Sequence, residues 1–100
     1  MGKRDLSLRC YNIGKYRYRE LKYFCMQYAD WMRSADAESK ANRETLEQAA
    51  RETDPALAAY IVRNVTSGIP YEHLGIVPCG RRQFYQARRK FFYLLSLKKK

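Results

Sequence analysis

The sequence GIPYEHLGIVPCGRRQFYQARRKFFYLL, residues 68–95, decides the fold of this chain. Its first part predicts a short helix over residues 70–75, because a proline at the first position of a helix leaves no hydrogen bond unmade. Glycine, proline and a second glycine then break the helix over residues 75–80 and turn the chain. Nothing interrupts a helix over residues 81–97. Residues 70–97 therefore have the layout of a helix-turn-helix whose second helix fits a DNA major groove.

The predicted helix over residues 81–97 has one apolar face and one basic face. The apolar residues recur at helical spacing and are expected to pack inward. They are Phe84, Ala87, Phe91, Leu94 and Leu95. The polar side chains are expected to contact DNA, because arginine matches guanine edges and phosphates, glutamine pairs with adenine and tyrosine donates to phosphate. These candidate DNA-binding residues are Arg81 at the entry, Arg82, Tyr85, Gln86 and Arg89 on the outward face, and Arg88 and Lys90 on the flanks, where they would serve phosphates. The helix holds no acidic residue, which favours a nucleic-acid contact over an ordinary solvated face.

The charge of the chain is unevenly distributed. Its formal net charge is +10, of which residues 1–33 carry +5 and residues 70–100 carry +7, whereas residues 34–69 carry −2. Such asymmetry indicates a polyanionic partner, with nucleic acid first and an acidic membrane or protein surface second.

Catalytic and metal-binding patterns are missing from the sequence. The three cysteines include no C-x-x-C pair and only one histidine, His73, is present, so neither a zinc site nor a disulfide framework is predicted. There is no glycine-rich phosphate loop and no catalytic motif. We therefore expect a protein that is not an enzyme and that uses no metal or cofactor. Neither a signal peptide nor a membrane-spanning stretch is recognisable, which predicts a cytoplasmic protein.

The remaining sequence predicts an all-α domain of four to five helices spanning residues 1–100. Helices are expected over residues 15–33, 40–52 and 54–67, besides the two of the C-terminal helix-turn-helix. The first is expected to bury Leu21, Phe24, Cys25, Tyr28 and Met32, with Tyr16, Tyr18 and Trp31 at the margins of this stripe. The second has only Leu46 and several alanines to bury and is expected to face solvent. The third should start at Thr53-Asp54-Pro55, by capping and a proline in the first turn, and end at Gly68 in a left-handed conformation.

Three parts of the chain resemble small proteins of Firmicutes prophages. These parts are YRYRELKYFCMQY (residues 16–28), LEQAA with IVRNVTSGI (residues 46–50 and 61–69), and IVPCGRRQFY continuing to RKFFYLL (residues 76–95). That family is distantly similar to phage transcriptional regulators of the RinA/ArpU type, and through them to the promoter-reading helix-turn-helix of sigma factors. The resemblance implies that the helix Tyr71 to Leu74 precedes the turn and that the next helix reads double-stranded DNA in the bacterial host cell. Family members carry a longer glycine-rich insertion between the first two helices, where this chain keeps only residues 34–39, so a partner contact through that loop is not carried over.

Two functions thus follow from the sequence. The first is a DNA-binding phage or prophage transcriptional regulator. The second is a helical adaptor that binds RNA polymerase or a phage packaging component through exposed tyrosines and Trp31. The sequence does not distinguish a monomer from a dimer.

Overall fold

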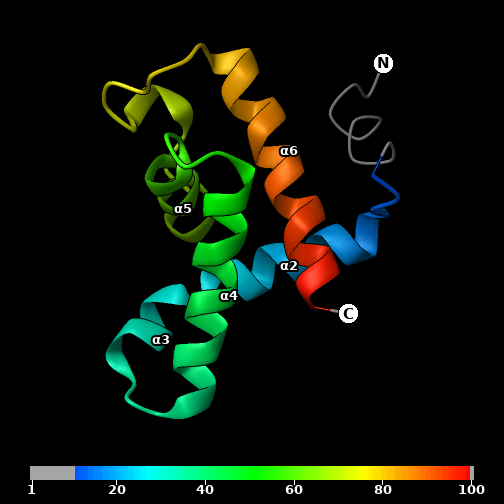
Figure 1. Cartoon of the computed structure of the whole chain (residues 1–100), viewed down its shortest axis with the longest axis vertical. Coiled ribbons are helices and arrows are strands. Elements are labelled where there is room, and N and C mark those ends of the chain that lie inside the picture. Colours follow the sequence, from blue (N-terminus) through cyan, green and yellow to red (C-terminus); the bar gives the residue numbers. More distant parts are fainter. Residues whose placement is uncertain (1–10, 100) are drawn as a thin grey trace.

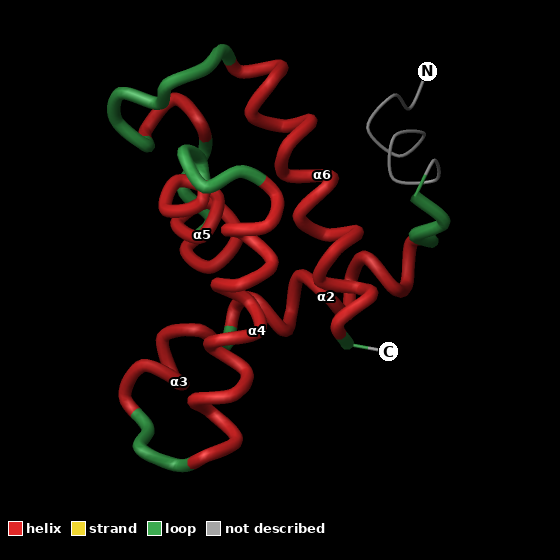
Figure 2. The backbone as a smooth tube through the Cα atoms, viewed as in Figure 1, coloured by secondary structure: helices red, strands yellow, loops and turns green. Residues whose placement is uncertain are grey.

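The computed structural model describes residues 11–99, and this part of the chain is all-helical (Figures 1 and 2). Its helices are α2 (Lys15–Met26), α3 (Tyr28–Arg33), α4 (Ala37–Thr53), α5 (Ala58–Ser67), the 3₁₀ turn η1 (Tyr71–His73) and α6 (Arg81–Lys98). The all-α class expected from the sequence is confirmed. The last helix lies within one residue of its predicted bounds.

The core forms where α4 and α6 pack against each other (Figure 1). Helix α5 packs against α4, and helix α2 packs against both α5 and α6. Leu46, Ala49 and Ala50 are the buried residues of α4, all with no exposed surface. The two alanines are small, so the backbones of the neighbouring helices can approach α4 closely. The helix therefore packs against its neighbours although most of its circumference is polar. The prediction that this helix would bury only Leu46 and alanines is confirmed, and its other residues are exposed or partly exposed.

The helix predicted over residues 15–33 is interrupted at Gln27, which separates α2 from α3. The Gln27 N–H donates to Phe24 O, three residues earlier, at 3.2 Å. This hydrogen bond has the spacing of a 3₁₀ turn, which is tighter than an α-helical turn and changes the direction in which the following side chains point. Trp31 is consequently buried, at 5% exposure, and its ring lies 4.6 Å from that of Phe24. Met32 is 53% exposed. The predictions that Met32 is buried and that Trp31 lies at the margin of the stripe are therefore wrong.

The α3 helix is also tied to α4 through a partly buried tyrosine. Tyr28 packs edge-on against the ring of Trp31, and its hydroxyl donates to the Glu47 carboxylate. Burial, followed by this hydrogen bond, raises the pKa of Tyr28 to about 12. The Tyr28 hydroxyl therefore stays protonated at physiological pH and links the two helices.

The helices α4 and α5 start at residues other than the predicted ones because of two aspartate side chains. Asp36 accepts a hydrogen bond from the Ser39 N–H at 2.7 Å, so α4 begins at Ala37 rather than residue 40. Asp54 accepts instead from the Ala56 N–H at 2.9 Å, which closes a turn and delays α5 to Ala58. The helix predicted over residues 70–75 is only the 3₁₀ turn η1.

Gly68 ends α5 as predicted, in the left-handed conformation with φ 69°. A Cβ at this position would meet no neighbouring atom, so a substitution would act through the backbone alone. We expect Gly68→Ala to lower the free energy of unfolding by about 1–2 kcal/mol, because L-residues with a Cβ disfavour positive φ. The measurement is urea unfolding followed by circular dichroism. Ser67→Ala, one residue earlier and helical, is the control and should change stability by less than about 0.5 kcal/mol.

Candidate nucleic-acid interface

The amino end of α6 carries positive charge and has no acidic residue in its own first turn. Gly80 is the N-cap, no side chain caps the helix, and the first turn holds no acidic residue. The N-terminal backbone N–H groups and Arg81 and Arg82 thus lie together at the positive end of the helix dipole. This combination favours an anion such as phosphate at the start of the helix.

The core anchors α6 along its inner face. Phe84, Phe91 and Leu95 are fully buried, as predicted. Phe92 is buried as well, at 1% exposure, which the sequence analysis did not anticipate. Four large side chains on one side of the helix leave its opposite side facing solvent.

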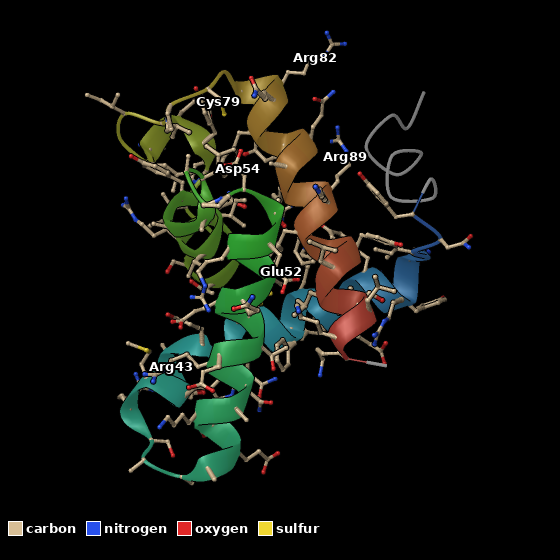
Figure 3. All side chains as sticks on the ribbon, viewed as in Figure 1. Arg43, Glu52, Asp54, Cys79, Arg82 and Arg89 are labelled. Atoms are coloured by element: carbon tan, nitrogen blue, oxygen red, sulfur yellow. The ribbon has the colours of Figure 1, made fainter. Side chains whose placement is uncertain are left out.

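Four polar residues form the surface that we call the outer basic face of α6, namely Arg82, Gln86, Arg89 and Lys90. Arg82, Gln86 and Lys90 are exposed, and Arg89 is partly exposed. Figure 3 shows Arg82 and Arg89 pointing away from the body of the molecule. Within residues 11–99, neither arginine forms an ion pair with a carboxylate. Their guanidinium groups are therefore oriented toward solvent and can meet a polyanion.

Arg81 lies beside this face but has an internal partner. Its Nε donates to the Glu72 carboxylate at 2.7 Å, and its guanidinium lies 5.0 Å from the centre of the Tyr85 ring. A hydrogen bond from its own backbone, and then Arg81, lower the pKa of Glu72, which is therefore ionised at neutral pH. Both side chains of the pair are more than half exposed, so an incoming phosphate can compete with the carboxylate for Arg81.

Tyr85 points toward the turn rather than into solvent. Its hydroxyl accepts a hydrogen bond from the Tyr71 N–H at 3.4 Å, and its ring packs edge-on against Phe84, 5.3 Å away. It connects α6 to η1. In this hydrogen bond the hydroxyl is only the acceptor, so its own O–H is still a donor for the predicted contact with DNA.

Arg88, predicted on a phosphate-binding flank, is partly buried and forms hydrogen bonds within the fold. Its Nε donates to Asn64 Oδ1 at 2.6 Å and its Nη1 donates to the Tyr18 hydroxyl at 3.1 Å. The guanidinium also lies 4.9 Å from the centre of the Phe92 ring. Asn64, which is 8% exposed, donates in turn to Ile69 O at 2.9 Å. Arg88 thus joins α6 to α2, α5 and the segment that follows α5.

A shallow hollow borders the outer basic face. It is lined by Tyr11, Thr53, Asp54, Leu57, Gln83, Gln86, Ala87 and Lys90. Figure 3 shows Asp54 at the turn that precedes α5, on the side toward α6. Its carboxylate repels phosphate, so it marks one edge of the surface available to a nucleic acid. Gln83 is exposed at the same edge and was missed by the sequence analysis, which assigned it no role.

Residues 11–99 bear on three other kinds of function, namely metal binding, thiol chemistry and membrane spanning. No three histidine, cysteine or acidic side chains are grouped there as they would be around a metal ion. Burial raises the pKa of the Cys25 thiol to about 12, and burial also raises the pKa of Cys79, so both thiols are protonated at neutral pH. In the same part of the chain, every helix is too short or too polar to cross a bilayer.

No family model matches this chain, and no curated protein or solved structure is similar to it. The resemblance to prophage proteins stays a prediction. A function is therefore inferred from the side chains of α6 and their surroundings.

Proposed function

We propose that this protein binds double-stranded DNA and reads a short sequence with the outer basic face of α6. The observation that carries the proposal is the position of Arg82 and Arg89, which project from a helix whose other side is anchored in the core. Anchoring matters because a reading helix must hold its side chains in register with the base pairs.

The spacing along α6 suits the base-pair repeat of DNA. Gln86 and Arg89 follow Arg82 by four and seven residues. At about 1.5 Å per residue, the three positions span roughly 10 Å of helix. Three base-pair steps of about 3.4 Å cover the same length. Arginine can bind guanine and glutamine can bind adenine through two hydrogen bonds each, so this face has the chemistry to distinguish about three consecutive base pairs.

The order of elements agrees with the proposal. In the predicted helix-turn-helix over residues 70–97, the short turn η1 stands in the place of the first helix and α6 in the place of the second, although η1 has only three residues and residues 74–80 separate it from α6. Phosphates would lie against Lys90 and against the amino end of α6 with Arg81. The resemblance to prophage proteins adds the expectation that the bound DNA is a promoter or operator of a phage, with RNA polymerase as a further partner.

One observation favours the adaptor function. Tyr16, Tyr23 and Met26 on α2 are 71%, 59% and 61% exposed, and large apolar side chains of this kind anchor protein interfaces. Trp31, which the sequence analysis named as an anchor, is buried and is not available for such a contact. Salt dependence separates the two functions, because DNA binding through several phosphates weakens steeply with salt whereas an apolar interface does not.

We expect Arg82→Ala and Arg89→Ala each to weaken binding to a selected duplex by about 1–3 kcal/mol, roughly five- to 150-fold. The selected duplex would come from a random DNA pool, and fluorescence anisotropy would give the affinities. Lys40→Ala is the control: it also removes one exposed positive charge, but it lies at the start of α4, far from α6 in Figure 1. Equal losses on every duplex would limit the two arginines to phosphate contacts. No binding of the wild-type protein at low salt would refute the proposal.

A further inference from the structure

One side of α2 presents a row of large side chains to solvent. Tyr16, Tyr23 and Met26 are each more than half exposed. Arg19, which lies between the two tyrosines in the sequence, is exposed as well. The residues of α2 that pack into the core lie on its opposite side. We call these four exposed residues the outer stripe of α2.

The outer stripe has the spacing of a surface that receives another helix. Its members follow one another by three, four and three residues. This alternation keeps side chains in line along a helix and is the repeat by which two helices pack together. Single exposed apolar side chains are ordinary on a protein surface, whereas three in one line form a strip. Tyr16 and Met26 lie about 15 Å apart along the helix, which a partner helix of about three turns covers.

Positive charge lies within the stripe and on its flank. The Arg19 guanidinium lies 5.6 Å from the centre of the Tyr16 ring, and Lys15 Nζ lies 5.5 Å from the same point. Lys22 is exposed on the same flank, seven residues after Lys15. Within residues 11–99, none of these three cations forms an ion pair with a carboxylate. The one acidic residue of α2, Glu20, pairs with another arginine of the same helix.

The charge decides which kind of helix fits the stripe. A partner that covers the two tyrosines also removes Arg19 from water, and a buried charge without a partner is costly. A carboxylate opposite Arg19 removes this cost through charge-assisted hydrogen bonds, and further carboxylates complement the two lysines. The matching chemistry is an amphipathic helix whose apolar side chains are flanked by aspartate or glutamate.

Two other occupants fit less well. If two copies of this protein paired through their stripes, like charges would meet: Arg19 would face Arg19 in a parallel pair, and the lysine flanks would face each other in an antiparallel pair. A single-stranded nucleic acid stacks its bases on free aromatic faces. Two cations already lie over the Tyr16 ring, so a base would have to displace one of them.

We propose that the outer stripe of α2 binds an acidic amphipathic helix of a partner protein, with a carboxylate of that helix on Arg19. The stripe lies on a different helix from the outer basic face of α6, so the proposal does not depend on DNA binding. It gives the adaptor function a binding surface and a class of partner.

The test is a selection on the full-length protein from a library of random peptides of about 15 residues, enough for four helical turns. We expect the selected peptides to be more acidic than the library and to carry apolar residues at helical spacing. Fluorescence anisotropy then gives the affinity of one selected peptide. Tyr16→Ala and Tyr23→Ala should each weaken its binding at least about fivefold, as truncation of an interface anchor predicts.

Ile76→Ala is the matched control, because it truncates an apolar side chain that is 93% exposed but lies in the turn before α6. The Tyr60 hydroxyl donates to Ile76 O at 3.0 Å, which holds this turn beside the start of α5, and Figure 1 shows the turn well away from α2. Ile76→Ala should change the affinity for the peptide by less than about 1.5-fold. All the substituted side chains are exposed, so the variants are expected to fold, and their thermal unfolding midpoints verify this.

Charge reversal tests the carboxylate on Arg19. Arg19→Glu should weaken binding of the acidic peptide at least about tenfold. Replacing the acidic residues of the peptide by lysine, one at a time, should restore binding to this variant at one position, which identifies the partner of Arg19.

Several results would overturn the proposal. The first is a selection that yields no peptide, or peptides no more acidic than the library. A second is peptide binding that survives both tyrosine substitutions or is lost in Arg82→Ala, which would place the peptide elsewhere, on α6 in the latter case. A dimer in sedimentation equilibrium that Tyr23→Ala dissociates would assign the stripe to a second copy. Competition between the peptide and single-stranded oligothymidine, lost in Tyr23→Ala, would assign it to a nucleic acid. Failure of the wild-type protein to bind duplex DNA would refute the function of α6 and leave this proposal standing.

Discussion

Replacing Phe84 by Ala is expected to lower the free energy of unfolding by about 3–5 kcal/mol, the usual cost of truncating a buried phenylalanine. Phe84 is completely buried, and its ring lies 5.6 Å from that of Tyr71 and 5.3 Å from that of Tyr85. The substitution leaves a cavity where α6 meets η1. A loss of this size is a large fraction of the total stability of about 5–15 kcal/mol that small domains have.

Chemical unfolding followed by circular dichroism measures this loss. Gln83→Ala is the matched control, since it truncates the preceding residue of the same helix, whose side chain is exposed. It should change the free energy of unfolding by less than about 0.5 kcal/mol. Equal stability of the two variants would show that the Phe84 ring does not lie in the core and that the inner face of α6 is assigned wrongly.

Replacing Arg88 by Met is expected to lower the free energy of unfolding by about 2–4 kcal/mol, because two charge-assisted hydrogen bonds are lost and buried polar groups remain without a partner. Methionine keeps much of the aliphatic length and the contact with Phe92, so the change reports mainly on the hydrogen bonds to Asn64 and Tyr18. A double-mutant cycle with Tyr18→Phe should give a coupling energy above about 0.5 kcal/mol.

Lys90→Ala is the control for Arg88, because it removes a positive charge from the exposed side of the same helix. It should leave stability unchanged and should reduce the salt dependence of DNA binding. The opposite result would be an Arg88→Met variant that is as stable as the wild type but whose affinity for DNA depends less on salt concentration. That result would assign Arg88 the phosphate-binding role that the sequence suggested.

The candidate interface was predictable in part from the sequence. The positions of Arg82, Gln86 and Arg89 on the outside of α6 follow from the helical spacing of Phe84, Phe91 and Leu95, and the structure agrees. Arg88 was not predictable in the same way. It lies at the border between the two faces, where spacing alone cannot tell an inward arginine from an outward one. Its partners lie 24 and 70 positions away in the sequence.

Other errors in the predicted fold arose from local hydrogen bonds. The stripe of the first helix assumed one continuous helix through Gln27, and the interruption there exchanged the places of Trp31 and Met32. Asp54 has the residue type of a helix cap, but its carboxylate closes a turn instead. The signal at Asp54 was thus recognised correctly in kind and placed wrongly by a few residues, whereas the interruption at Gln27 was not predicted.

What the sequence determined by itself is the helical class, the left-handed end of α5 at Gly68, the non-helical turn at Gly75 to Gly80, and the two faces of α6. These features depend on backbone preferences and periodicity within a few consecutive residues. Tertiary structure alone decided that Arg88 bonds inside the fold, that Trp31 is buried and that Ile76 is held outward. The reason is physical: a hydrogen bond or a packed ring requires a partner at the right distance, and distant segments supply that partner only after the chain has folded.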